Sequence, residues 1–129
     1  MDIRRNTRRF TPGFVAAIFV AYGIALFAPR VAFAHAVLVS SQPAVNSTVS
    51  GPDIAVVLKY NSRVDMKHST LTLLAPDGRV EKVAIESEPE PGLLAAKLTG
   101  LVKGAYVLRW QVLATDGHIT RGKVPFHVQ

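Results

Sequence analysis

Short stretches in which apolar residues alternate with polar ones recur along residues 36–128, and this alternation is typical of half-buried β-strands. The clearest stretch is Ala105 to Ala114, where Arg109 and Gln111 fall on one face. Its other face is apolar and consists of Tyr106, Leu108, Trp110 and Val112. No stretch shows a long helical apolar period. The pattern predicts seven strands: Ala36 to Val39, Ile54 to Tyr60, Thr70 to Leu74, Val80 to Ile85, Leu93 to Leu98, Ala105 to Ala114 and Gly122 to Val128.

Turn-forming residues separate these predicted strands at the spacing of a β-sandwich, roughly 8 to 12 residues. The turns are Gln42-Pro43, Gly51-Pro52, Pro76-Asp77-Gly78, Pro89-Glu90-Pro91-Gly92 and Val102-Lys103-Gly104. We therefore predict an all-β fold in which two antiparallel sheets pack around an apolar centre. The acidic stretch of Glu86, Glu88 and Glu90 is broken by prolines, which predicts a solvated loop.

The first 34 residues follow a different pattern, that of an export signal. Four arginines within residues 4–9 precede an uncharged apolar run from Phe14 to Ala28. A run of about 15 residues suits a signal-peptide core and falls short of the roughly 20 residues of a spanning helix. Ala32-Phe33-Ala34 fits a signal-peptidase site, so we predict that residues 1–34 are a signal peptide cleaved after Ala34. An uncleaved membrane anchor is the alternative, and both the Sec and the twin-arginine export routes stay open.

Cleavage would change what the composition indicates. The whole chain carries a net charge of +6, but residues 1–34 contain five of its fifteen basic residues and one of its nine acidic residues. The remaining 95 residues, 35–129, have a net charge of +2, which is weak support for nucleic-acid binding. The chain has no cysteine, which excludes disulfides and thiolate metal sites. No nucleophile elbow or phosphate-binding loop is evident, so we do not expect an enzyme.

Two features of the processed chain point to a metal site. His35 would become the first residue, and a free amino-terminal histidine can chelate a metal through its α-amine and its imidazole Nδ1. Asp116-Gly117-His118 follows the longest predicted strand, where Gly117 favours a tight turn. Residues two apart can then point to the same side, so one carboxylate and one imidazole can converge on an ion. Asp-Gly-His alone is most often an ordinary turn, but together the two features predict a metal site.

Residues 35–129 resemble the CopC family of periplasmic copper-binding proteins. The resemblance lies in His35 to Pro43, Pro52 to Val64, Pro76-Asp77-Gly78, Gly104 to Trp110 and Thr115 to Gly122. It implies an immunoglobulin-like sandwich or barrel that binds one Cu(II) through His35, Asp116 and His118. It also implies a monomeric periplasmic copper carrier or buffer in copper homeostasis or resistance, with a CopD-like inner-membrane protein as the suggested partner.

The chain departs from this family in two places. Some members have a carboxylate near the copper where this chain has Ser62, so the fourth ligand stays open between water, Ser62 and Asp65. Some members also have a methionine-rich Cu(I) site, whereas residues 35–129 contain only Met66. We therefore expect no dedicated Cu(I) site, although Met66 and His68 could form a weak one. Otherwise His68 and His127 are expected to be surface residues.

Two other functions remain as alternatives. One is a metal-free immunoglobulin-like interaction module, which would be favoured if the mature chain did not begin at His35. The other is a copper oxygenase built on an amino-terminal histidine. Such enzymes use a second histidine rather than an aspartate, and they need a broad polymer-binding surface that 95 residues hardly provide.

Overall fold

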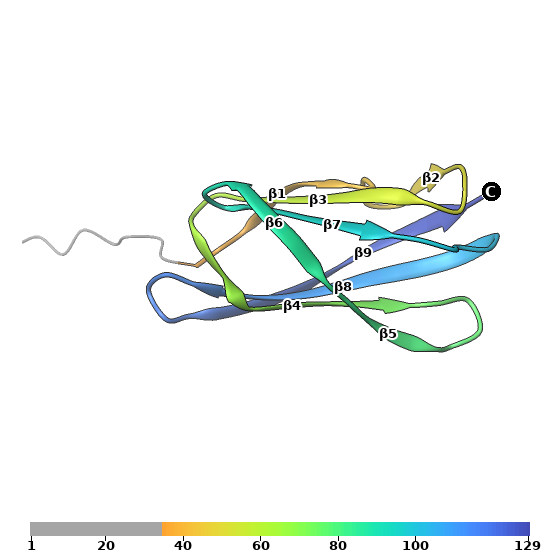
Figure 1. Cartoon of the computed structure of the whole chain (residues 1–129). Helices are drawn as coiled ribbons and strands as arrows, with labels where there is room; N and C mark the ends of the chain where they lie inside the picture. Colours follow the sequence, from red (N-terminus) through yellow and green to blue (C-terminus); the bar gives the residue numbers. More distant parts are fainter. Residues whose placement is uncertain (1–34) are drawn as a thin grey trace, which may run out of the picture. The chain divides into compact units, whose positions relative to one another are not determined.

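The computed structural model describes residues 35–129, which form two β-sheets that face each other (Figure 1). The four-stranded sheet has the order β1-β3-β7-β6, and the five-stranded sheet has the order β2-β9-β8-β4-β5. The strands are β1 (Leu38–Gln42), β2 (Ser47–Val49), β3 (Ile54–Tyr60), β4 (Val64–Leu74), β5 (Val80–Val83), β6 (Ile85–Glu90), β7 (Leu93–Leu98), β8 (Gly104–Ala114) and β9 (Ile119–Val128). The predicted export signal, residues 1–34, lies outside the described residues. Residues 35–129 contain no helix with the length and apolar character needed to span a bilayer.

The core lies between the sheets and follows the predicted alternation. On β8, Tyr106, Leu108, Trp110 and Val112 are all buried. Across the core, Trp110 makes an edge-to-face contact with Tyr60 of β3, with ring centroids 5.3 Å apart. Burial of these apolar faces removes hydrocarbon from water, which is the main force that holds the two sheets together. The predicted all-β, immunoglobulin-like fold is thus confirmed.

The number of strands differs from the prediction, since residues 35–129 form nine strands rather than seven. The predicted strand Val80 to Ile85 is wrong, because β5 and β6 belong to different sheets and the chain crosses between them at Ala84. The short β2 was missed because its three residues are too few to show an alternation. Strand β2 pairs in parallel with the end of β9.

The acidic stretch 86–90 was predicted as a loop, which is wrong. It forms the edge strand β6, with irregular register against β7. The glutamates are exposed as expected, and Pro89 is tolerated because an edge strand needs hydrogen bonds on one side only. Backbone pairing with β7 therefore outweighs the polar character of the side chains.

The longest hairpin of the structure, β8–β9, positions the predicted Asp-Gly-His motif. Its register runs without interruption from Gly104 paired with Val128 to Leu113 paired with Ile119. The connecting turn, residues 115–118, therefore lies at one end of the sandwich. The chain enters the domain at the same end, where Ala36 is bonded to Thr120 (Figure 1).

Candidate metal centre

The segment that carries His35 is fixed to the end of the sandwich by three hydrogen bonds. The backbone N–H of Val37 donates to Oδ1 of Asn61 at 2.8 Å, and the N–H of Asn61 donates to the carbonyl of Val37 at 3.0 Å. The hydroxyl of Thr120 donates to the carbonyl of Ala36 at 2.8 Å. Ala36 itself is only 1% exposed. His35 therefore projects from an anchored backbone, although its own side chain is exposed.

Asp116 and His118 are brought together by the β8–β9 turn. The N–H of Gly117 donates to the carbonyl of Ala114 at 2.9 Å, and the N–H of Ala114 donates to the carbonyl of His118 at 2.8 Å. Gly117 has a φ of 89°, a conformation that glycine adopts without the strain of a Cβ. Within the turn, the N–H of His118 donates to Oδ1 of Asp116 at 3.0 Å, and Nδ1 of His118 lies 2.9 Å from Oδ2.

The three predicted ligands His35, Asp116 and His118 meet at one exposed point. The imidazole centroids of His35 and His118 are 4.8 Å apart, with the rings inclined by 70°. One ligand atom from each of the three residues lies within 4.8 Å of the others. With metal–ligand distances of about 2.0 Å, neighbouring donors of a square lie about 2.8 Å apart and opposite donors about 4.0 Å. The cluster is therefore nearly tight enough to hold one ion without a change of fold.

The electrostatics of the cluster favour an ionised carboxylate. The pKa of Asp116 is lowered, first by the hydrogen bond from the backbone N–H of His118 and then by the side chains of His118 and His35. An ionised carboxylate only accepts hydrogen bonds and can bind a cation directly. Imidazole nitrogens and a carboxylate oxygen form a donor set that suits Cu(II).

A second Asp–His pair lies at the irregular part of β4, between Asp65 and Thr70. Nδ1 of His68 is 2.8 Å from Oδ2 of Asp65, and the N–H of His68 donates to Oδ1 at 3.2 Å. Among the described residues, the three-residue cluster does not include Asp65. Met66, named with His68 as a weak Cu(I) site, packs against the core.

The other residues considered from the sequence, His127, His68 and Ser62, do not belong to the three-residue cluster. His127 and His68 are exposed, as expected for surface residues. The hydroxyl oxygen of Ser62, the other protein candidate for a fourth ligand, is enclosed and has no hydrogen-bond partner among residues 35–129.

Asn61 and Thr120 anchor the backbone beside His35, and no role was predicted for either from the sequence. Both residues lie in the stretches that carry the family resemblance, and this was the available signal. Neither was assigned a role, because the contacts join positions 24 and 84 residues apart.

Comparison with known proteins identifies the relatives of this chain. The family model described as the CopC domain matches residues 38–129. Copper resistance protein C of Xanthomonas campestris pv. juglandis is 31% identical over 106 residues, which cover 76% of this chain and 83% of that protein. Copper transport protein CutJ of Bacillus subtilis (strain 168) is 27% identical over 106 residues, 80% of this chain. The matched region spans only a fifth of the length of CutJ.

A solved structure of similar fold is the crystal structure of CopC from Methylosinus trichosporium OB3b. The two structures superpose with a TM-score of 0.68 at 28% sequence identity. The match covers 74% of this chain and 94% of that one. The similarity thus extends over nearly the whole domain of that protein.

Proposed function

Because the chain belongs to the CopC family, we propose that it binds one Cu(II) ion in the periplasm and acts as a monomeric copper carrier or buffer. The observation that carries this proposal is the convergence of His35, Asp116 and His118, whose ligand atoms lie within 4.8 Å of one another. Relatives named for copper resistance and copper transport support copper as the metal. The role is binding and transfer rather than catalysis.

Each residue would supply a defined donor. His35 of the processed chain would bind through its α-amine and Nδ1, His118 through one imidazole nitrogen, and Asp116 through a carboxylate oxygen. Cu(II) prefers such a tetragonal set of nitrogen and oxygen donors. The 2.9 Å between Nδ1 of His118 and Oδ2 of Asp116 is close to the separation of two neighbouring donors on one ion. Copper and a shared proton would therefore compete for the same pair of atoms.

Processing would complete the site. While residues 1–34 are attached, the nitrogen of His35 is an amide and binds Cu(II) much less readily than an amine. Cleavage after Ala34 would convert it into an α-amine. The hydrogen bonds at Ala36 and Val37 would hold the new terminus beside Asp116 and His118. Copper binding would thus begin only after export.

The exposure of the three residues suits a carrier. His35, Asp116 and His118 are all exposed, so a partner could approach the ion directly. We propose that the copper passes to an inner-membrane transport protein of the CopD type. In CutJ, a region similar to this chain is part of a protein about five times the length of the match, which supports a connection between this domain and copper transport.

Native mass spectrometry of the protein recovered after export, with and without Cu(II), tests the proposal. We expect a chain that begins at His35 and gains one copper ion. The matched control carries one extra alanine before His35, which keeps the imidazole and removes its α-amine from the chelate. This control should bind copper much more weakly. A chain that begins at His35 and binds copper no better than the control would contradict the proposal and favour a metal-free interaction module.

A further inference from the structure

The outward face of the five-stranded sheet carries four basic side chains that are not part of the candidate metal centre. Lys82 of β5, Arg109 of β8 and Lys123 of β9 lie in one row across the sheet. Thr72 of β4 pairs with Lys82 on one side and with Arg109 on the other. Arg109 in turn pairs with Lys123. Arg121 lies in the next row, paired with Gln111. We call Lys82, Arg109, Arg121 and Lys123 the basic face. All four side chains are exposed.

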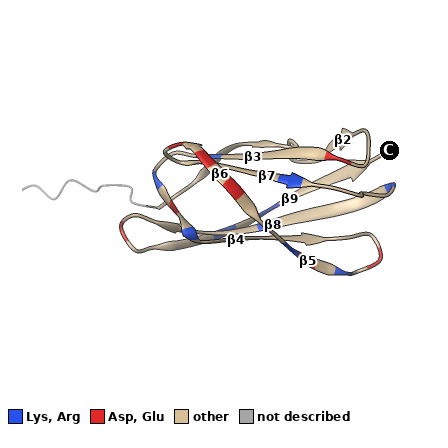
Figure 2. Ribbon diagram, viewed as in Figure 1, with Lys and Arg blue, Asp and Glu red and all other residues tan. Residues whose placement is uncertain are grey.

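The positive charge of the basic face is not neutralised within the domain. Among the ion pairs of residues 35–129, none includes any of its four members. Asp65 lies on the same sheet, towards the metal-centre end, but its carboxylate is bonded to His68. Acidic residues lie on β6 of the other sheet, and basic ones lie on β5, β8 and β9 (Figure 2). The one acidic residue of β5, Glu81, is paired with Arg79 rather than with the basic face. The basic face is therefore free to attract an anionic partner.

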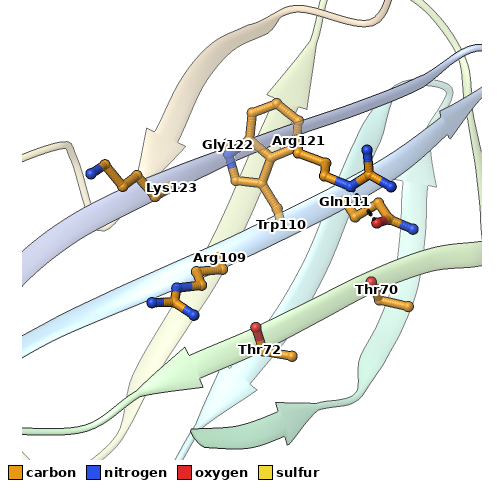
Figure 3. Close-up of a pocket in the computed structure, with 8 residues that line it drawn as sticks. All are labelled: Thr70, Thr72, Arg109, Trp110, Gln111, Arg121, Gly122 and Lys123. Carbon is orange, nitrogen blue, oxygen red and sulfur yellow. Dashed lines mark hydrogen bonds between the residues drawn. The ribbon is translucent and has the colours of Figure 1, made fainter. Parts of the chain in front are cut away.

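A hollow of about 510 Å³ lies within the basic face (Figure 3). Three of its cations surround the hollow together with hydrogen-bonding groups of Thr70, Thr72 and Gln111. Nε of Arg121 donates to the side-chain oxygen of Gln111 at 2.7 Å, which holds that guanidinium over the sheet. Trp110 and Gly122 also line the hollow, and no side chain fits at Gly122 because its Cβ would overlap the indole. The hollow thus offers hydrogen-bond donors, positive charge and some apolar surface.

We propose that the basic face binds an acidic, extended segment of a partner protein. Charge complementarity favours a carboxylate-bearing partner and speeds its encounter. Side chains on one face of a strand recur about every 6.7 Å, as Thr70 and Thr72 do on β4 and Arg121 and Lys123 do on β9. An extended chain that runs along these strands presents its alternate side chains at the same spacing. The centre of the face is recessed, which suits an inserted side chain better than a flat lipid surface.

The basic face lies next to the candidate metal centre. Arg121 of β9 follows His118 of the turn by three residues. Two register pairs, Val112 with Thr120 and Leu113 with Ile119, separate it from the turn. A partner held there would have its own ligands close to the copper. This role in copper transfer rests on the proposed function, whereas binding of an acidic segment does not.

Binding of a fluorescein-labelled peptide of five Glu-Thr repeats to the metal-free protein, followed by fluorescence anisotropy, tests the inference. We expect binding at low salt that weakens as salt is added, since screening shortens the range of the attraction. The double variant Arg109→Glu/Lys123→Glu should weaken binding at least about tenfold, a typical cost of placing like charges in an interface. The matched control is Lys97→Glu/Lys103→Glu, which has the same change of net charge at exposed positions off the basic face. It should change binding less than about twofold.

Equal weakening by both double variants would overturn the inference, because net charge alone would then explain binding. Binding to phosphatidylglycerol vesicles without binding to the peptide would also overturn it, in favour of a lipid surface. If the charge reversal disturbs folding, as judged from near-ultraviolet circular dichroism, Arg109→Gln/Lys123→Gln serves instead and should weaken binding several-fold.

Copper uptake measured on the same samples separates this inference from the proposed function. Normal copper binding without peptide binding would contradict the docking role of the basic face and leave the proposed copper site unaffected. Peptide binding without copper binding would contradict the proposed copper site and leave the docking role of the basic face unaffected.

Discussion

Two Asp–His pairs with nearly the same local geometry lie in the described part of this chain, and only one of them belongs to a three-residue cluster. In each pair Nδ1 of the histidine contacts Oδ2 of the aspartate, at 2.9 Å for His118 and Asp116 and at 2.8 Å for His68 and Asp65. In each pair the histidine N–H also donates to Oδ1 of the same aspartate. Both aspartates have a lowered pKa as a result.

The difference between the pairs is the third residue. His35 reaches Asp116 and His118 because Asn61 and Thr120 anchor the backbone that follows it. The structure brings no comparable third ligand from residues 35–129 to Asp65 and His68. An Asp–His hydrogen bond is therefore a local property of a turn or bulge, whereas a candidate metal centre needs a ligand from a distant part of the chain.

The largest expected difference between the pairs concerns copper affinity after loss of the histidine. His118→Ala should lower Cu(II) affinity more than about 100-fold, because loss of a direct ligand exceeds the 10- to 100-fold effect of losing a supporting residue. Competition titration against a chelator of known affinity measures the change.

His68→Ala is the matched control and should change the affinity less than about twofold. Equal losses in His118→Ala and His68→Ala would show that the two pairs contribute alike to copper binding, and the comparison would fail.

A smaller effect is expected at the residue that anchors His35. Thr120→Val removes the hydrogen bond to Ala36 while keeping the shape of the side chain, so the chelating terminus becomes less well positioned. Copper affinity should fall about tenfold, in the range of supporting residues around metal sites. The free energy of unfolding of the metal-free protein should fall by about 1 kcal/mol, the usual value of one hydrogen bond.

Ser69→Ala provides the corresponding change at the other pair, because the hydroxyl of Ser69 donates to the backbone carbonyl of Asp65. It should lower stability by a similar amount and leave copper affinity unchanged. A copper affinity of Thr120→Val equal to that of the parent protein would mean that His35 does not need this anchor.

The smallest effect concerns acid stability, in which the two pairs should behave alike without metal. The pKa of Asp65 is lowered mainly by the hydrogen bond with the His68 side chain, and that of Asp116 mainly by the backbone N–H of His118. A carboxyl whose pKa is lower in the folded state stabilises the fold above its unfolded pKa. This contribution is lost as the pH falls from the ordinary value of an aspartate, about 3.9, through the lowered value of the folded state.

Asp65→Asn and Asp116→Asn should therefore each make the fall of the unfolding midpoint over this pH range slightly less steep. The effect should be modest and should weaken with added salt, since both carboxylates are at the surface. Urea unfolding at several pH values measures it. A change in only one of the two variants would show that the pairs already differ in the metal-free protein.

Sequence alone predicted the parts of the molecule that depend on local patterns. The alternation in Ala105 to Ala114 predicted the buried face of β8, and Gly117 predicted the turn that joins Asp116 and His118. The split between β5 and β6 was not predictable, because an apolar stretch does not show in which sheet each half pairs. Cleavage after Ala34 stays a prediction from sequence, since residues 1–34 lie outside the described residues.

The sequence by itself determined that this protein has no cysteine ligand, that one aspartate and one histidine share a glycine turn, and that another histidine lies beside a predicted cleavage site. Only the tertiary structure decided which of them meet. His35 and His118 are 83 positions apart, and their approach depends on sheet pairing and on the contacts of Asn61 and Thr120. The basic face arises in the same way, because cross-strand register aligns cations from β5, β8 and β9. Local periodicity reports the face of a strand, but the neighbours across a sheet are set by register, which depends on the turns and on burial of one face of each strand against the rest of the fold.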